Sequence, residues 1–204
     1  MKINKDIPQN STYKQWCILC GSENIQRKIL ENGNTKYFCN DCNQLQDRMI
    51  VIDPLIKWWI DPVTRDYWHE SVGIFIFNNK NEILLFKRTI FPFAYTVPAG
   101  HLDINEDVYS AIKREVREET GISHIDVTLF ANEDISGDEC RRGCDHHKWY
   151  LFVSRFESDF EVTISDEGIE ANWMSINDTL KVELTYPVRY FLEKYNQSLI
   201  PNEK

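Results

Sequence analysis

The sequence predicts a domain of mixed α/β structure, preceded by a small cysteine-rich segment. Two apolar stretches, 72–77 and 83–88, are short and bounded by turn residues, which indicates a hairpin of two largely buried strands. Helix signals follow at about 106–120. A further strand at about 171–176 and a closing amphipathic helix at about 187–197 complete the domain, and four cysteines in two CxxC pairs precede it.

Composition and charge argue against several classes of protein. Of the 204 residues 42% are hydrophobic, which is enough for a sizeable core, and the formal charge of −9 argues against a broadly basic nucleic-acid binder. The first residues lack the apolar core of a signal peptide, and the most apolar stretch, 49–60, is interrupted by Asp53 and Lys57 well short of a membrane span. We therefore expect a cytoplasmic protein with no membrane partner, for which nucleic acid is a possible but not a favoured partner.

Four of the six cysteines have the spacing of a zinc site. Eighteen residues separate the two CxxC pairs, whose cysteines are Cys17, Cys20, Cys39 and Cys42. Two disulfides or a redox pair are the alternatives, but disulfides need an oxidising compartment, and a redox motif needs no second matched pair. Four thiolates leave no open position, so we expect a structural Zn²⁺ ion. With the hairpin expected between the pairs, this segment resembles a zinc ribbon.

The helix expected at 106–120 has three glutamates on one face. Asn105 is the expected N-cap and Gly121 the C-cap. The glutamates stand at positions i, i+3 and i+4, where like charges oppose each other by roughly 0.2 to 0.5 kcal/mol a pair. They are Glu115, Glu118 and Glu119. A solvated acidic face relieved by neighbouring basic residues is the ordinary explanation, and a set of hard oxygen ligands for Mg²⁺ or Mn²⁺ is the functional one.

The residues around the glutamates favour the functional explanation. Seven fixed residue types at typical usage of about 7% each would coincide by chance on the order of once in 10⁸ starting points. They are Gly100, Glu106, Arg114, Glu115, Glu118, Glu119 and Gly121. This pattern resembles the complete signature of the Nudix hydrolases, and the resemblance covers roughly residues 69–195. It implies an α/β/α sandwich with a mixed sheet.

The resemblance also implies which residues form the site. Ligands of a catalytic Mg²⁺ or Mn²⁺ are expected from the carbonyl oxygen of Gly100 and from the carboxylates of Glu115, Glu118 and Glu119. Arg114 would orient a carboxylate, and Glu115 and Glu118 are candidates for the catalytic base. Glu167, six residues before Trp173, has a place similar to the distant glutamate that binds metal or acts as base in MutT-type members. Weaker alternatives are Glu133, Glu139 and Glu170, and Glu167 could also be an ordinary loop acid.

Residues 132–156 form a long polar loop that leads into a strand, and this loop holds candidate phosphate ligands. Loops of such length in a compact domain are commonly functional. The candidates are Arg141, Arg142, His146 and Lys148, together with Lys87 and Arg88 at the end of the second strand. A merely solvated loop is the alternative. A second metal site is a further hypothesis, since Cys140 and Cys144 are followed by Asp145, His146 and His147.

The chain divides into three expected parts: the zinc ribbon at 1–48, an aromatic-rich connector at 49–68, and the Nudix domain at 69–204. The connector is too aromatic for a flexible linker, so we expect it to pack against the domains or against a second subunit in a homodimer. The architecture is similar to that of NADH pyrophosphatases. The chain nevertheless lacks the proline-rich specificity motif of that subfamily, because it has no proline between Pro98 and Pro187.

The resemblance implies hydrolysis of a pyrophosphate bond by a metal-activated water. The expected substrate is a nucleoside diphosphate linked to another moiety, such as a dinucleotide or a nucleotide sugar. The alternative is a non-catalytic Nudix module that senses a nucleotide while its zinc ribbon binds nucleic acid or protein. The complete signature favours the enzyme, because a sensor has no need to keep every carboxylate, and residues 1–48 show no basic cluster.

Overall fold

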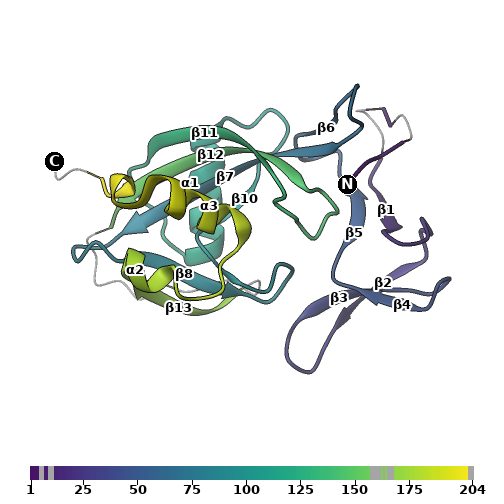
Figure 1. Cartoon of the computed structure of the whole chain (residues 1–204), viewed down its shortest axis with the longest axis horizontal. Helices are drawn as coiled ribbons and strands as arrows, with labels where there is room; N and C mark the ends of the chain where they lie inside the picture. The colour runs from purple at the N-terminus through teal and green to yellow at the C-terminus, as the bar shows by residue number, and fades with distance from the viewer. Residues whose placement is uncertain (5–6, 9–11, 157–161, 163, 165–167, 202–204) are drawn as a thin grey trace.

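A mixed eight-stranded sheet forms the centre of the protein (Figure 1). The structure is a computed structural model that describes residues 1–4, 7–8, 12–156, 162, 164 and 168–201. The strands along the sheet follow the order β11-β12-β7-β8-β13, while β6 and β10 also pair with β7, and β9 pairs with β8. The strands are β6 (Trp58–Ile60), β7 (Tyr67–Phe77), β8 (Ile83–Arg88), β9 (Tyr95–Thr96), β10 (Ala99–His101), β11 (Thr128–Ser136), β12 (His146–Arg155) and β13 (Gly168–Met174). Because β12 runs parallel to β7 and antiparallel to β11, the sheet is mixed as expected.

Helices cover both faces of this sheet. The helices are α1 (Val108–Thr120), α2 (Ile176–Thr179) and α3 (Tyr186–Tyr195), and a 3₁₀ turn follows at Asn196–Leu199. Alternate residues of a strand point to opposite faces, and in β7 Ile74 packs with Ile112 of α1, whereas Phe75 packs with Phe191 of α3. The expected α/β/α sandwich is therefore confirmed.

The helix α1 begins later than the sequence predicts. Its N-cap is Asp107, whose carboxylate accepts hydrogen bonds from the backbone N–H groups of Tyr109 and Ser110 at 3.0 and 3.1 Å. The expected N-cap, Asn105, instead has a φ of 64° and lies in the turn before the helix. The prediction of Asn105 was therefore wrong, because the chain turns through a left-handed residue there. The predicted C-cap is confirmed at Gly121, which has a φ of 73°.

The cysteine-rich segment forms two small sheets. β2 (Ile25–Ile29), β3 (Thr35–Cys39) and β4 (Gln44–Gln46) form one of them, and the β2–β3 pair is the predicted hairpin. The other joins β1 (Lys14–Cys17) to β5 (Met49–Ile52). Residues of the expected connector thus pair with the expected ribbon, and the division at 48 and 68 stays a prediction.

The connector is packed against the sheet by its aromatic side chains. Trp58 is buried and meets Tyr67 edge-on, with ring centroids 6.0 Å apart, and Trp59 stacks on Trp68 at 5.5 Å. β6 also pairs with the first residues of β7, which explains why β7 starts five residues before the predicted strand at 72.

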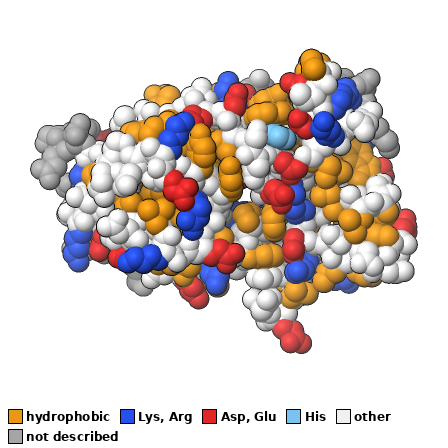
Figure 2. All heavy atoms as spheres, viewed as in Figure 1, with side chains coloured by type: hydrophobic (Ala, Val, Ile, Leu, Met, Phe, Trp, Pro, Cys, Tyr) orange, Lys and Arg blue, Asp and Glu red, His pale blue; other side chains and the backbone are white. Residues whose placement is uncertain are grey.

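The surface charges and the lengths of the helices can be compared with the partners expected from the sequence. On the face shown in Figure 2, acidic and basic side chains are interspersed and no basic patch stands out. None of the helices in the described residues is both long and apolar enough to cross a membrane. The cytoplasmic location and the homodimer stay predictions.

Candidate active site

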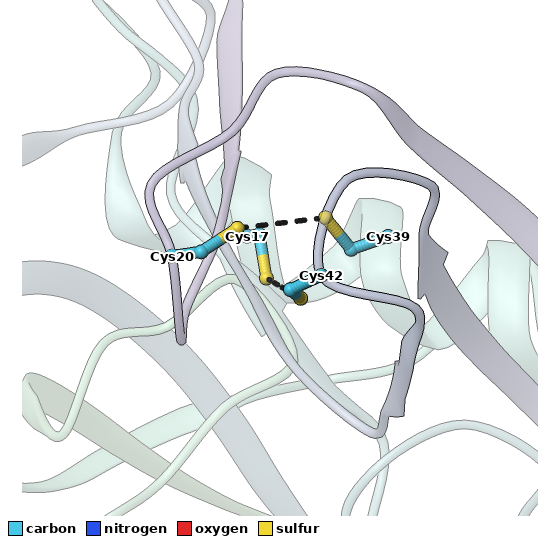
Figure 3. A group of neighbouring side chains, drawn as sticks. All are labelled: Cys17, Cys20, Cys39 and Cys42. Atoms are coloured by element: carbon cyan, nitrogen blue, oxygen red, sulfur yellow. Dashed lines mark hydrogen bonds between the residues drawn. The ribbon is translucent and has the colours of Figure 1, made fainter.

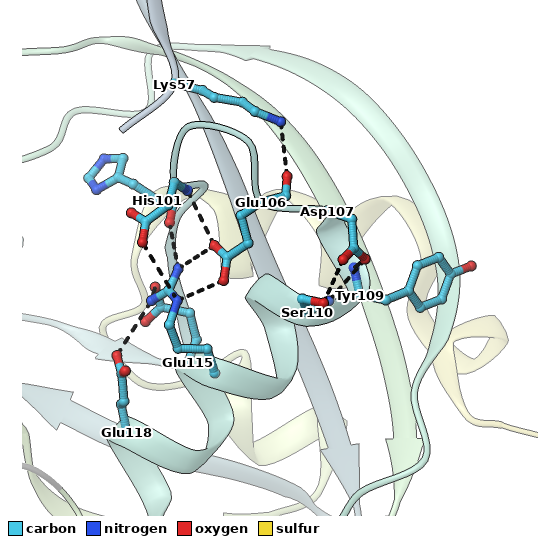
Figure 4. Close-up of polar contacts among 10 residues, drawn as sticks. Lys57, His101, Glu106, Asp107, Tyr109, Ser110, Glu115 and Glu118 are labelled. Carbon is cyan, nitrogen blue, oxygen red and sulfur yellow. Dashed lines mark hydrogen bonds and ion pairs between the residues drawn. The ribbon is translucent and has the colours of Figure 1, made fainter. Parts of the chain in front are cut away.

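Arg114 links Glu106, before α1, to Glu115 and Glu118 within the helix. Figure 4 shows these three carboxylates gathered beside α1. The Nε and Nη2 atoms of Arg114 donate to the two carboxylate oxygens of Glu106 at 3.0 and 2.8 Å, which is a bidentate pair. Nη1 donates to Glu115 Oε1 at 2.6 Å and lies 3.4 Å from Glu118 Oε2. Nη2 also donates to the backbone carbonyl of His101 at 3.2 Å. One guanidinium therefore fixes the loop before the helix relative to Glu115.

The Glu115 carboxylate lies against the backbone of Gly100. A Cβ atom added at Gly100 would lie 2.1 Å from Glu115 Cδ, which is far inside van der Waals contact. Only a residue without a side chain leaves room for this carboxylate, because glycine lets another group approach the backbone closely. The requirement for glycine at position 100 is therefore a packing requirement of the site.

Burial changes the acidity of Glu115. Its side chain is 12% exposed, and desolvation raises its pKa from 4.5 to about 7, although the charge of Arg114 opposes this rise. Keeping this buried carboxylate charged at neutral pH costs free energy unless a cation lies beside it. Such perturbed groups concentrate at functional sites.

The other two glutamates of α1 have different surroundings. Glu119 accepts a hydrogen bond from the backbone N–H of Ala99 at 2.8 Å and lines the same pocket as Glu115. Glu118 is 52% exposed and is not among the residues that line this pocket. The helix thus turns Glu115 and Glu119 towards the pocket and leaves Glu118 at its rim.

The pocket is lined by both acidic and basic side chains. It has a volume of about 260 Å³ and is lined by Gly100, Glu115 and Glu119 and also by Arg88, Arg141 and Arg142. The three arginines come from β8 and from the loop between β11 and β12, so they meet only in the folded chain. Arg142 is anchored by Asp53, whose Oδ2 lies 2.6 Å from its Nη1.

One predicted phosphate ligand lies outside the pocket, and one predicted glutamate is not described by the structure. Lys148 is not among the pocket-lining residues, and its Nζ lies 5.8 Å from the ring centroid of Tyr150. Glu167 lies outside the described residues. Of the alternatives, Glu139 lines the pocket, whereas Glu133 accepts a hydrogen bond from the Tyr190 hydroxyl at 2.7 Å and Glu170 accepts one from that of Tyr95 at 3.0 Å.

The acidic residues of the pocket fit a hard divalent cation. Carboxylates and backbone carbonyls are the ligands that Mg²⁺ and Mn²⁺ prefer. A cation beside Glu115 would compensate the negative charge that burial disfavours. Because Gly100 has no side chain, its backbone also lies beside this carboxylate. Gly100, Glu115 and Glu119 are therefore the residues here that suit a cation, while Glu118 would have to turn inward to join them.

A second group of side chains lies at this pocket, and the sequence pointed to only two of its members, Cys140 and His147. His101, Cys140 and His147 line it, and they lie close to the buried His69. His69 and His147 are far apart in the sequence and became neighbours through the parallel pairing of β7 with β12. The second metal site suggested by the sequence at 140–147 therefore involves Cys140 and His147 at most, because the other members of that set have different partners.

The four cysteines of the two CxxC pairs converge as expected of a zinc site (Figure 3). Their sulfur atoms all lie within 4.8 Å of one another, with Cys17 and Cys42 at 3.7 Å and Cys20 and Cys39 at 3.6 Å. These distances exceed the S–S bond of about 2.05 Å. They match the separation of about 3.8 Å expected between two sulfur ligands of a tetrahedral zinc ion with Zn–S bonds of about 2.3 Å. The geometry therefore suits a structural zinc ion, which stays a prediction.

Substituting one of these cysteines tests the zinc site. We expect Cys20→Ser to lower the zinc content by about one ion per chain, because a hydroxyl is a much poorer zinc ligand than a thiolate. Metal analysis after purification without chelator measures this content. Cys144→Ser is the matched control, since that thiol donates to the carbonyl oxygens of Tyr67 and His146 at 3.0 and 2.9 Å and a hydroxyl can do the same. Unchanged zinc in a folded Cys20→Ser protein would exclude the site.

Comparison with known proteins places residues 67–195 within a NUDIX domain model. An 8-oxo-dGDP phosphatase of Danio rerio is 32% identical over 123 residues, which cover 56% of this chain and 34% of the relative. Nudix hydrolase 26, chloroplastic, of Arabidopsis thaliana is 27% identical over 142 residues, which cover 59% and 65%. The asymmetrical bis(5′-nucleosyl)-tetraphosphatase of Caenorhabditis elegans is 26% identical over 134 residues, which cover 64% and 96%. The chain thus matches only about a third of the first relative and just under two thirds of the second.

Solved structures share the same fold. An Ap4A hydrolase of C. elegans in a binary complex superposes with a TM-score of 0.53 at 22% identity, covering 64% of this chain and 97% of that one. The NUDIX domain of NrtR from Shewanella oneidensis, complexed with ADP ribose, superposes with a TM-score of 0.56 at 17% identity, covering 69% and 94%. At sequence identities of 22% and 17%, these superpositions establish the fold of the domain alone.

Proposed function

The chain belongs to the Nudix family, and we propose that it is an enzyme that hydrolyses a pyrophosphate bond of a nucleotide with Mg²⁺ or Mn²⁺ as cofactor. The observation that carries this proposal is a pocket lined by both carboxylates and arginines. Glu115 and Glu119 suit a divalent cation, and Arg88, Arg141 and Arg142 suit phosphate oxygens. A pyrophosphate bound between them would have both of its phosphates neutralised.

The proposed substrate is a nucleoside diphosphate linked to another moiety. One relative supports this class, because its name specifies a dinucleoside tetraphosphate. The name of another specifies a free nucleoside diphosphate, which shares the phosphoric anhydride bond but has no second moiety. The architecture expected from the sequence, a zinc ribbon before a Nudix domain, adds NADH to the candidates as a prediction.

The basic and the acidic residues of the pocket have separate tasks in the proposed reaction. Arg88, Arg141 and Arg142 bind and orient the phosphates, and Asp53 holds Arg142 in place. Glu115 and Glu119 hold the cation, and Arg114 positions Glu115 through the 2.6 Å contact. A divalent ion supplies positive charge for the phosphate oxygens and for the attacking water. The base that takes the proton of this water stays a prediction, with Glu118 among the described residues and Glu167 outside them.

A substrate panel tests the proposal. We expect release of nucleotide products with Mg²⁺ or Mn²⁺ from at least one of NADH, ADP-ribose, dinucleoside polyphosphates, nucleotide sugars, 8-oxo-dGDP and 5′-triphosphate RNA. Separation of the products by chromatography identifies the bond that is cleaved. Glu119→Gln should lower turnover of that substrate about 10²-fold or more, because the amide can still accept the hydrogen bond from Ala99 but carries no charge for the cation.

The matched control is Glu193→Gln, since this glutamate is 60% exposed on α3 and pairs with Arg189 at 3.4 Å. It should keep the parent rate. Binding of a nucleotide with no turnover by the parent protein would contradict the hydrolase and support the sensor. Equal turnover by the parent and Glu119→Gln would remove that carboxylate from the mechanism.

A further inference from the structure

Three histidines and one cysteine gather beside the catalytic pocket. This histidine–cysteine cluster consists of His69 on β7, His101 at the end of β10, Cys140 in the loop after β11, and His147 on β12. One ligand atom of each lies within 4.8 Å of those of the other three. His69 Nδ1 is 3.0 Å from His101 Nε2 and 3.8 Å from Cys140 Sγ.

The cluster has the dimensions of a metal site. A tetrahedral zinc ion with Zn–N bonds of about 2.0 Å and Zn–S bonds of about 2.3 Å separates its ligand atoms by about 3.3 to 3.6 Å. Two contacts within the cluster, at 3.0 and 3.8 Å, lie on either side of this range. The rings also meet from different directions, since the His69 ring plane lies at 87° to that of His101 and at 72° to that of His147. Small side-chain rotations would therefore place four donors around one point.

A carboxylate orients one of the ligands from outside the cluster. Asp138 Oδ2 lies 3.1 Å from His147 Nδ1 as an ion-pair contact without hydrogen-bond geometry, and it accepts a hydrogen bond from Trp149 Nε1 at 2.7 Å. Asp138 is itself only 5% exposed. A carboxylate on one ring nitrogen fixes the tautomer of a histidine and directs the other nitrogen to a metal. His147 Nε2 is thus the atom available to the cluster.

Hydrogen bonding alone does not account for these side chains. His69 and His147 are 0% and 2% exposed, and the close polar contacts of His69 Nδ1 are with His101 Nε2 at 3.0 Å and Cys140 Sγ at 3.8 Å, both within the cluster. Buried polar groups are normally paired, so a close group of imidazoles that mainly contact one another is costly. A cation that receives a lone pair from each member removes this cost.

This cluster offers nitrogen and sulfur ligands, whereas Glu115 and Glu119 offer carboxylate oxygens. We propose that the histidine–cysteine cluster binds a zinc ion, separate from the four-cysteine site and from the glutamates of α1. Imidazole nitrogen and thiolate sulfur favour zinc over Mg²⁺ or Mn²⁺, which take oxygen ligands. Three of the four residues line the pocket, so an ion can enter from it. Four protein ligands leave no open position, which makes this ion structural.

The ion would hold the phosphate-binding loop in place. The loop at 137–145 carries Arg141 and Arg142, and its backbone already receives hydrogen bonds from Met49 and Val51 of β5 at 3.1 Å. On its other side the bond from Cys140 to the ion would tie the loop to β7. Both arginines would then be fixed opposite the glutamates of α1.

Zinc content tests the proposal without reference to activity. We expect the parent protein, purified without chelator, to contain about two zinc ions per chain, one in each site. Cys140→Ser and His101→Gln should each lower this number by about one. His101 is partly exposed and belongs to no hydrophobic core cluster, so its variant tests the site even if the cysteine variant does not fold. The matched control is His146→Gln, since its Nδ1 faces Ser136 Oγ at 3.1 Å outside the cluster and its zinc content should equal that of the parent.

X-ray absorption at the zinc edge of the parent protein gives a second measurement that needs no variant. Two occupied sites predict about five sulfur and three nitrogen ligands for every two zinc ions. One zinc ion per chain with sulfur ligands alone, even after addition of excess zinc, would overturn the proposal. Parent zinc content in a folded His101→Gln protein would overturn it as well.

Discussion

Glu115→Gln is expected to lower kcat by about 10³-fold and to stabilise the metal-free protein above pH 7. The loss of activity follows from the loss of a charge that faces the pocket, where single electrostatic groups contribute about 10² to 10³ and acid–base groups up to about 10⁴. The glutamine keeps the size of the side chain and can accept the hydrogen bond from Arg114. The packing against Gly100 is therefore preserved.

The gain in stability follows from the raised pKa. Because burial raises the pKa of Glu115 from 4.5 in the unfolded chain to about 7, the folded protein binds this proton more tightly. The free energy of unfolding therefore falls as the pH rises from about 4.5 to about 7, by on the order of 3 kcal/mol in total. A neutral glutamine avoids this loss, so the variant should melt at a higher temperature than the parent at pH 8 and at a similar temperature at pH 4.

Steady-state kinetics with the substrate found in the panel and thermal denaturation with chelated Mg²⁺ measure the two effects. Glu193→Gln removes an exposed charge and should change neither. A parent rate in Glu115→Gln would exclude this carboxylate from catalysis. A variant that is less stable than the parent at pH 8 would show that the charged form is well accommodated without a cation.

Gly100→Ala is expected to lower kcat by about 10²-fold while the domain still folds. The new Cβ would lie 2.1 Å from Glu115 Cδ and from Oε1, so the carboxylate has to move by more than 1 Å. Displacements of this size at a reacting site cost about 10²-fold in rate. Kinetics of the variant and its circular dichroism spectrum check the two parts of this expectation.

A double-mutant cycle with Glu115→Asp identifies the cause. The shorter aspartate withdraws the carboxylate from position 100, so Gly100→Ala should cost much less in the Glu115→Asp protein than in the parent. An equal loss of kcat in the two backgrounds would contradict the proposed clash and would indicate a change in the backbone of β10 instead.

The sequence by itself determined the features whose residues lie close together along the chain. The two CxxC pairs predicted the convergence of four cysteines, because each pair lies in one tight turn. The three glutamates of α1 share one face through helical periodicity, and Gly121 ended the helix because its left-handed conformation suits glycine. Apolar runs likewise predicted the β7–β8 hairpin, which was found.

The tertiary structure decided everything that joins distant segments. Arg88 and Arg141 meet at one pocket while Lys148 points to Tyr150, although all three looked alike as phosphate ligands in the sequence. The start of α1 at Asp107 depended on the turn at Asn105. The histidine–cysteine cluster as a whole was also hidden, because it requires the parallel pairing of β7 with β12 and the pairing of β10 with β7. Sheet register is set by long-range burial, which local spacing does not encode, so these neighbours exist only in the folded chain.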